Sequence, residues 1–187
     1  KKTEQKILEE LARRDSFADT YLLGAVSPIV SDLLETLRTH PEIGLVAVAG
    51  SFRRAKETVH DLDFLVSTKE PALVCEDFTT LPQVASVIAC GETKASVRLT
   101  NGLQCDLRAV SGAQFPFALM YFTGSKEHNV AIRSLALKKG WSLNEYGFTP
   151  AENAKLSEEI PADVHEERDI YQALGLHPRV GQVDWSA

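Results

Sequence analysis

A chain of 187 residues, 44% hydrophobic and 25% charged, has the composition of an ordinary globular protein and is long enough for a substantial core. This composition excludes a disordered chain, and the formal charge of −6 argues against a generally basic nucleic-acid coat, so any contact with DNA must come from local clusters. Cys75, Cys90 and Cys105 are widely spaced, which favours buried free thiols in a reducing compartment over a zinc site. No apolar run approaches membrane-spanning length, so we expect no membrane and a cytoplasmic protein.

The first forty residues carry two helical patterns. In residues 2–14 the apolar side chains recur at helical spacing and the charged ones lie elsewhere, which predicts an amphipathic helix. Residues 27–39 repeat the pattern, with Ser27 as a candidate N-cap and Pro28 in the first turn. Simple packing against a core accounts for most residues of both helices.

From residue 42 to about residue 110 most of the signals predict strands. The apolar runs lie at 45–49, 61–66, 84–89, 95–99 and 103–110, and a helix is predicted around 72–78. Asn101 and Gly102 stand between the last two runs, and Asn-Gly in that position predicts a hairpin with a two-residue turn.

Candidate functional residues concentrate between positions 50 and 63. Strand alternation places Asp61 and Asp63 on one face, and two adjacent carboxylates repel each other unless a cation lies between them, which suggests a divalent metal. Gly50 lets the backbone come close to a ligand, and Ser51 is a candidate helix start whose free N–H groups favour a phosphate. An Asp-x-Asp pair alone is common on exposed strands, but its combination with Gly-Ser predicts a site for a nucleoside triphosphate with its metals.

A third acid, Asp106, lies between apolar neighbours on the predicted strand 103–110. A carboxylate in that position costs stability unless it has a partner. It is therefore either paired with Arg108 or another donor, or it is a metal ligand, and its presence beside Asp61 and Asp63 favours the ligand.

Beyond a break at residues 111–116, the pattern predicts a helix over 117–121 that ends at Thr123-Gly124. A second helix over 126–139 is closed by Gly140, and short helices are predicted near 157–160 and 165–174.

Three motifs in this order resemble the DNA polymerase X family, the polymerase beta-like nucleotidyltransferases. They are Gly-Ser-Phe-Arg-Arg from residue 50 with Glu-Thr and Asp-x-Asp after it, Gln-Cys-Asp-Leu-Arg at 104–108, and the stretch 121–147. The resemblance runs from residue 2 to about residue 176. The amino-acid sequence at 56–58, 91–99 and 144–147 resembles that of the bacterial and archaeal members of the family.

The resemblance implies an α+β fold: a nucleotidyltransferase palm with a mixed β-sheet, a helical N-terminal subdomain and a small α/β C-terminal thumb. The implied boundaries are 1–40 for a helical DNA-binding subdomain with half of a helix-hairpin-helix, 41–115 for the catalytic palm and 116–187 for the thumb, which binds the nascent base pair. The implied activity is that of a DNA-directed DNA polymerase that transfers a nucleotide from dNTP to a primer 3′-hydroxyl and fills gaps in base excision repair. Two alternatives stay open, a template-independent nucleotidyltransferase and a catalytically weak DNA-binding fragment.

The resemblance also implies roles for individual residues. Catalysis and the binding of two Mg²⁺ or Mn²⁺ ions are expected of Asp61, Asp63 and Asp106. Nucleotide binding is expected of Gly50, Ser51, Arg54, Tyr121, Phe122, Gly124 and Asn129. DNA contacts are expected of Lys2, Thr3, Lys94 and Arg133. A surface ion pair is the alternative for Arg53, and a solvated polar face is the alternative for Asn129 and Arg133.

The implied partners are primer–template or gapped DNA and a dNTP, in the cytoplasm of a bacterium or archaeon and associated with the nucleoid. Members of this type carry an N-terminal DNA-binding domain and a C-terminal phosphoesterase (PHP) domain, so we expect this chain to be the polymerase core of a longer protein. Three positions depart from the family pattern, one of them Lys126, where polymerase beta has an acid. His60 stands where Gly is usual before the first acid, and Gln104 replaces a basic residue beside the third acid.

Overall fold

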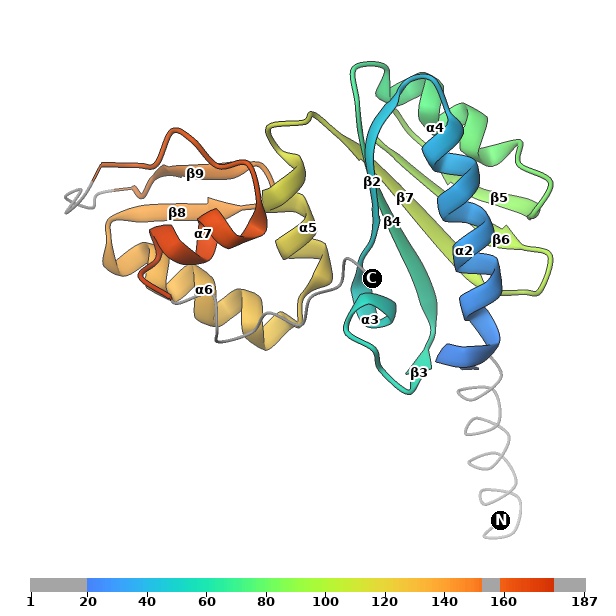
Figure 1. Cartoon of the computed structure of the whole chain (residues 1–187), viewed down its shortest axis with the longest axis horizontal. Helices are drawn as coiled ribbons and strands as arrows, with labels where there is room; N and C mark the ends of the chain where they lie inside the picture. Colours follow the sequence, from blue (N-terminus) through green and yellow to red (C-terminus); the bar gives the residue numbers. More distant parts are fainter. Residues whose placement is uncertain (1–19, 153–158, 177–187) are drawn as a thin grey trace, which may run out of the picture.

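The computed structural model describes residues 20–152 and 159–176, which form two lobes that meet at helix α5 (Figure 1). The first lobe contains β1 (Tyr21–Leu22), α2 (Leu23–Thr39), β2 (Ile43–Val48), α3 (Gly50–Arg53), β3 (Thr58–Val59), β4 (Asp61–Thr68), α4 (Pro71–Thr79), β5 (Val84–Cys90), β6 (Lys94–Leu99) and β7 (Gln104–Val110). The second contains α5 (Phe115–Thr123), α6 (Lys126–Lys138), β8 (Trp141–Asn144), β9 (Gly147–Pro150) and α7 (Glu167–Ala173). The predicted α+β class with a mixed sheet is confirmed.

The main sheet has five strands in the order β2-β4-β7-β6-β5. Its central pair, β4 and β7, is parallel, and the other pairs are antiparallel. In the parallel register Asp63 lies directly opposite Asp106. The short strands β1 and β3 form a separate antiparallel pair. The sheet therefore brings together two acids that are 43 positions apart in the sequence.

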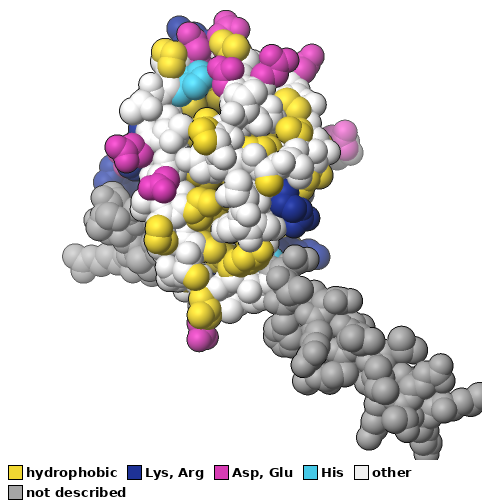
Figure 2. Space-filling model, turned by 90° about the vertical axis from the view of Figure 1, so that its right-hand side faces the viewer, with side chains coloured by type: hydrophobic (Ala, Val, Ile, Leu, Met, Phe, Trp, Pro, Cys, Tyr) yellow, Lys and Arg dark blue, Asp and Glu magenta, His cyan; other side chains and the backbone are white. Residues whose placement is uncertain are grey.

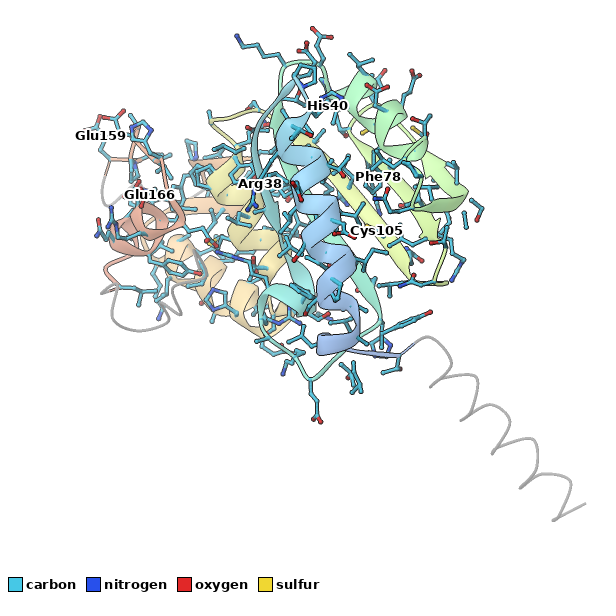
Figure 3. All side chains as sticks on the ribbon, turned by 45° about the vertical axis from the view of Figure 1, so that its right-hand side comes forward. Arg38, His40, Phe78, Cys105, Glu159 and Glu166 are labelled. Atoms are coloured by element: carbon cyan, nitrogen blue, oxygen red, sulfur yellow. The ribbon has the colours of Figure 1, made fainter. Side chains whose placement is uncertain are left out.

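One face of the sheet is covered by α2 and α4 (Figure 1). Along β4 the even-numbered side chains Leu62, Phe64 and Val66 are fully buried in this core. Cys105 of β7 and Phe78 of α4 belong to the same cluster, in the layer beneath α2 (Figure 3). Because side chains alternate along a strand, the odd-numbered residues of β4 face the other side of the sheet, where Leu65 packs against α5.

Helix α2 begins one turn earlier than its sequence predicts. The predicted N-cap Ser27 lies inside the helix, where its hydroxyl donates a 2.8 Å hydrogen bond to the carbonyl of Leu23, and the residue at the N-cap is Leu22. Pro28, which the sequence places in the first turn, lies in the second. The apolar stripe of the helix includes Val26, which is buried, so packing extends the helix toward its N-terminus, past the start that Pro28 indicates.

The hairpin between β6 and β7 is present, but its turn has three residues instead of the predicted two. The amide of Leu99 donates to the carbonyl of Leu103, which leaves positions 100–102 as the connection. Gly102 has φ of +89°, and the Asn101 side chain accepts a hydrogen bond from the Leu103 amide. Glycine supplies the positive φ that such a three-residue turn needs.

The second lobe packs α5, α6 and α7 with the β8–β9 hairpin around the buried Trp141. The sequence predicted its helices to within about two residues but not its two strands. The predicted helix at 2–14, with Lys2 and Thr3, lies outside the described residues. Half of the predicted segment 157–160 does too, and its described residues 159 and 160 are not helical.

In the described part of the chain, no helix combines the length and apolar character that crossing a membrane requires. The face of the first lobe that points away from the second carries hydrophobic and acidic side chains, with basic ones at its margins (Figure 2). At the upper end of α2, Nε2 of His40 lies 3.1 Å from the Asp77 carboxylate of α4, which ties the two covering helices together (Figure 3).

Candidate active site

The predicted acids lie together on the open face of the main sheet. Leu62 of β4 is completely buried on the side of the helical layer, while Asp61 and Asp63 on either side of it face away from that layer. Asp106 is flanked in the same way by the buried residues Cys105 and Leu107. Since paired strands run about 4.8 Å apart, the register of Asp63 with Asp106 makes their side chains neighbours.

Gly50 is the residue that lets the Asp63 carboxylate lie against the backbone. It has φ of +60°, and a Cβ built on it would overlap the carboxylate oxygen of Asp63. The amide of Ala49 also donates a 2.7 Å hydrogen bond to the carbonyl of Asp63. The Gly-Ser turn and the Asp-x-Asp strand are therefore one packed unit, and only glycine fits at its closest point.

Asp63 is held in an unfavourable electrostatic environment. Burial raises the pKa of its carboxyl group, the negative charges of Asp61 and Asp106 raise it further, and the pKa reaches about 6 in spite of Lys94 and Arg108 nearby. No hydrogen bond to this carboxylate is found within the described residues. A cation placed among the three acids would relieve both the desolvation and the repulsion.

Asp106 is in the opposite situation because it has hydrogen-bond donors. Nζ of Lys94 lies 2.5 Å from one carboxylate oxygen, and the Gln104 amide donates a 3.2 Å hydrogen bond to the other. Burial acts to raise the pKa of Asp106, but hydrogen bonds from Lys94, Gln104 and Ser96 outweigh it and the pKa is lowered. The partner that the sequence left open is thus Lys94, and the proposed partner Arg108 points elsewhere.

Arg108 connects the acids to the second lobe. Its guanidinium group lies over the ring of Phe122, with Cζ 4.4 Å from the ring centre. The rings of Tyr121 and Phe122 pack edge to face, with their centres 5.2 Å apart. Sequence reasoning overlooked Arg108 as a site residue, although alternation along β7 places it on the same face as Asp106.

Two side chains of the Gly-Ser-Phe-Arg-Arg segment carry buried polar atoms without a partner. They are the hydroxyl of Ser51 and Nε of Arg54. Arg54 is anchored by its Nη1, which donates to the carbonyl of Thr123. Ser51 lies within the one-turn helix α3 and not at its cap, which is Ala49. Buried polar groups are nearly always hydrogen-bonded, so these orphaned donors point to a missing ligand with acceptor atoms.

Arg53 is a clamp between the lobes and not the surface ion pair that the sequence suggested. Its guanidinium group binds both carboxylate oxygens of Glu167, at 2.9 and 2.6 Å, and Thr123 Oγ1 at 2.7 Å. Both side chains are more than four-fifths buried. Glu167 is 114 positions from Arg53, and no local pattern in the sequence marks it as a partner.

Asn129 and Arg133 share one face of α6, as their spacing predicts, but within the described residues a hydrogen bond is found only for Asn129. Its amide nitrogen donates a 2.7 Å hydrogen bond to the carbonyl of Tyr121, and its Oδ1 is buried without a partner. Arg133 is exposed. Gly124 follows α5 with φ of +67° and approaches Arg54 closely enough that a Cβ there would lie 3.3 Å from Nη1. The segment 121–129 and the Gly-Ser turn therefore border one site.

The oxygen atoms of the three acids are suitable metal ligands, although the carboxylates do not lie close enough together to hold an ion. Within the described ranges 20–152 and 159–176, no three carboxylate, imidazole or thiol groups are grouped closely enough to hold an ion. Lys94 occupies one oxygen of Asp106. The raised pKa of Asp63 nevertheless marks a place where a cation is favourable, and carboxylate oxygens suit Mg²⁺.

A small hollow of about 210 Å³ extends the site along β4 and β7, lined by Tyr21, His60, Asp61, Arg98, Gly102 and Gln104. His60, which departs from the family pattern, lies on its wall, and its Nδ1 is 3.3 Å from the Thr20 hydroxyl. The hollow is thus lined by one of the three acids, Asp61, and by Gln104, whose amide donates to Asp106.

Comparison with known proteins identifies the family of this site. Residues 118–180 match the family model described as DNA polymerase beta thumb. The chain is 38% identical over 178 residues to the DNA polymerase/3′-5′ exonuclease PolX of Bacillus subtilis, an alignment that covers 94% of this chain and 30% of that protein. The chain belongs to the DNA polymerase X family.

Viral family X proteins are similar over a shorter stretch. Repair DNA polymerase X from two isolates of African swine fever virus is 28% and 29% identical over 144 residues, covering 72% of this chain and 78% of the viral proteins. The matched thumb segment includes Asn129 and Glu167, whereas the three acids lie before it. The family resemblance stated from the sequence motifs is thus confirmed, while the roles of the individual residues rest on the geometry above.

Proposed function

We propose that this chain is the catalytic core of a template-directed DNA polymerase that adds a nucleotide from a dNTP to a primer 3′-hydroxyl and fills short gaps during base excision repair. The chain spans 30% of the length of the Bacillus subtilis relative, whose name includes a DNA polymerase activity. The proposal therefore rests on family membership and on the site itself.

The observation that carries the proposal is that three carboxylates share one face of the sheet next to a turn with two buried, unpartnered donors, Ser51 Oγ and Arg54 Nε. Asp63 and Asp106 lie in register, Asp61 shares their face, and Gly50 packs directly on Asp63. The unpartnered Ser51 hydroxyl lies on the turn beside Gly50. A triphosphate with divalent cations would satisfy the orphaned donors on one side and the repelling acids on the other.

The residues divide the work as follows. Asp61, Asp63 and Asp106 would hold two Mg²⁺ or Mn²⁺ ions, with Asp106 contributing only to the ion on the primer side. When bound, the ions activate the primer hydroxyl and neutralise the triphosphate and the departing pyrophosphate. Asp106 accepts the proton of the hydroxyl, and Gly50 and Ser51 bind the terminal phosphates.

The second lobe orients the incoming nucleotide in this proposal. Arg54 binds phosphate through its free Nε, while Tyr121 and Phe122 pack against the sugar. Asn129 uses its free Oδ1, and with Arg133 it reads the minor-groove edge of the new base pair. Residues 41–115 then act as the palm and 116–187 as the thumb, and residues 1–40 grip the DNA backbone, with Lys2 and Thr3 as contacts.

The test is single-nucleotide incorporation on a duplex with a one-nucleotide gap, with each dNTP supplied separately in Mg²⁺ or Mn²⁺. We expect the wild type to add the complementary nucleotide. Asp106→Asn should lower the rate about 10²–10⁴-fold, the range that a general base supplies. Asp32→Asn, at an exposed position on α2, is the matched control and should be fully active.

The other outcomes separate the alternatives. Extension with any dNTP, and insensitivity to Asn129→Ala and Arg133→Ala, would establish a template-independent transferase. Binding of the gapped DNA and Mn²⁺ without extension would overturn the polymerase proposal and leave a DNA-binding fragment.

A further inference from the structure

Lys94 lies where a cation would bind to Asp106. It comes from β6, two residues before Ser96, which pairs with Asp106 across the strands. Its ammonium group lies 2.5 Å from one carboxylate oxygen, and the Gln104 amide takes the other oxygen. The third acid of the site is therefore fully engaged by this chain's own donors.

The three acids are consequently in two different states. Asp63 has no hydrogen-bond donor within the described residues and lies beside two negative charges. Asp106 is paired with a positive side chain whose own exposed fraction is 41%, against 16% for the acid. Within the described residues no donor occupies the Asp63 carboxylate, whereas Asp106 must first lose Lys94 before its paired oxygen can take a cation.

Lys94 also has an unfavourable neighbour that bears on where it goes after release. In the β6–β7 register it lies directly opposite Arg108, and like charges in that position repel. Arg108 is held over the Phe122 ring, and Lys94 is held by Asp106. If Asp106 turned to a divalent cation, Lys94 would face two positive groups, so it would need another anion. A half-exposed lysine at the edge of the site suits a backbone phosphate of DNA, which takes lysine as a point charge.

We propose that Lys94 is a positioning residue that occupies the cation side of Asp106 in the DNA-free protein and moves to a DNA phosphate when the substrate binds, so that DNA and the primer-side metal bind cooperatively. The inference rests on the proposed function, since it takes Asp106 as a metal ligand. By linkage, DNA then raises metal affinity by the same factor by which metal raises DNA affinity.

The test measures Mn²⁺ binding directly, by the electron paramagnetic resonance signal of free Mn²⁺, with and without a gapped duplex whose primer ends in a dideoxynucleotide. Lys94→Met keeps most of the length of the side chain and removes its charge and its donors, and Lys94→Arg restores a cation. Lys69→Met, at an exposed position after β4, is the matched control. Thermal melting of each variant checks that it is folded.

Without DNA, Lys94→Met should bind Mn²⁺ about fivefold more tightly than wild type, the fold-change that corresponds to an ion pair at the upper end of the exposed range. Wild type and Lys69→Met should gain Mn²⁺ affinity on adding DNA, and Lys94→Met should gain much less. Lys94→Arg should behave as wild type.

Equal or weaker Mn²⁺ binding by Lys94→Met without DNA would overturn the proposal, as would an undiminished gain on adding DNA. Asp63→Asn distinguishes this failure from a failure of the proposed function. If Asp63→Asn leaves Mn²⁺ binding intact, the metal site itself is wrong. If it abolishes binding while Lys94→Met has no effect, only the role of Lys94 is wrong.

Discussion

The Asp63 carboxylate should destabilise the metal-free protein at neutral pH, and Asp63→Asn should remove that cost. Its pKa is raised from 3.8 to about 6 in the folded protein. The folded state therefore binds the proton more tightly than the unfolded chain does, and stability is lost as the pH rises from about 4 through 6. At 1.36 kcal/mol per pKa unit the cost at pH 7.5 is at most about 3 kcal/mol.

We expect a gain of about 1–2 kcal/mol for Asp63→Asn at pH 7.5, because the partly exposed side chain can shift toward water and recover part of the cost. That gain corresponds to a rise of about 2–8 °C in Tm for a domain of this size. At pH 5 the unfolded chain is mostly ionised and the folded carboxyl is mostly protonated, so linkage predicts that about half of the advantage remains.

The measurement is thermal and urea unfolding of both proteins in EDTA at pH 5 and 7.5, with Asp32→Asn as a control that should show no such gain. Adding Mg²⁺ should raise the Tm of wild type more than that of Asp63→Asn, since a ligand stabilises only the state that binds it. The reasoning would be refuted if Asp63→Asn were less stable than wild type in EDTA at pH 7.5, or if its advantage grew at pH 5.

Three further outcomes follow from the packing of the site. Gly50→Ala should lower the free energy of unfolding in urea by more than about 1 kcal/mol, because alanine is strained at the positive φ of this position and its Cβ overlaps Asp63. The variant should also lose nucleotide incorporation. A fully active, equally stable variant would contradict the close approach of Gly50 to Asp63. Arg53→Met and Glu167→Gln should each lower the free energy of unfolding by about 2–3 kcal/mol, and the double variant should show a coupling energy above about 1 kcal/mol. If the two effects were simply additive, the Arg53–Glu167 ion pair would contribute nothing to stability. Leu62→Ala should cost about 2–5 kcal/mol in the same assay, because the side chain is fully buried beneath the acids, and a loss below 1 kcal/mol would show that the layer can collapse around it.

The sequence predicted the acids well because their signal is local. Asp61 and Asp63 are two residues apart on a strand, so alternation alone sets their common face. The neighbour relation of Asp63 and Asp106 depends on a parallel pairing, which no local pattern specifies, and it was reached through the family resemblance.

The contacts between the two lobes could not be predicted from the sequence. Arg53 and Glu167 meet only when α3 and α7 pack against the same helix α5, and although Arg53 lies in the Gly-Ser-Phe-Arg-Arg motif, nothing in the sequence marks Glu167 as its partner. The pairing of Lys94 with Asp106 depends in the same way on register, and nothing local separates this lysine from an exposed one. The early start of α2 was missed because Pro28 is a strong signal for a first turn, and burial of Val26 overrides it.

The parallel pairing of β4 with β7 also determines when the site can come into being during synthesis. Antiparallel neighbours can form as soon as a turn is made, but a parallel pair must wait for the whole intervening excursion through α4, β5 and β6. Asp61 and Asp63 leave the ribosome about forty residues before Asp106. A nascent chain that has not yet produced β7 therefore has two of the three acids, and the third joins them only when the last strand of the sheet is inserted at its centre.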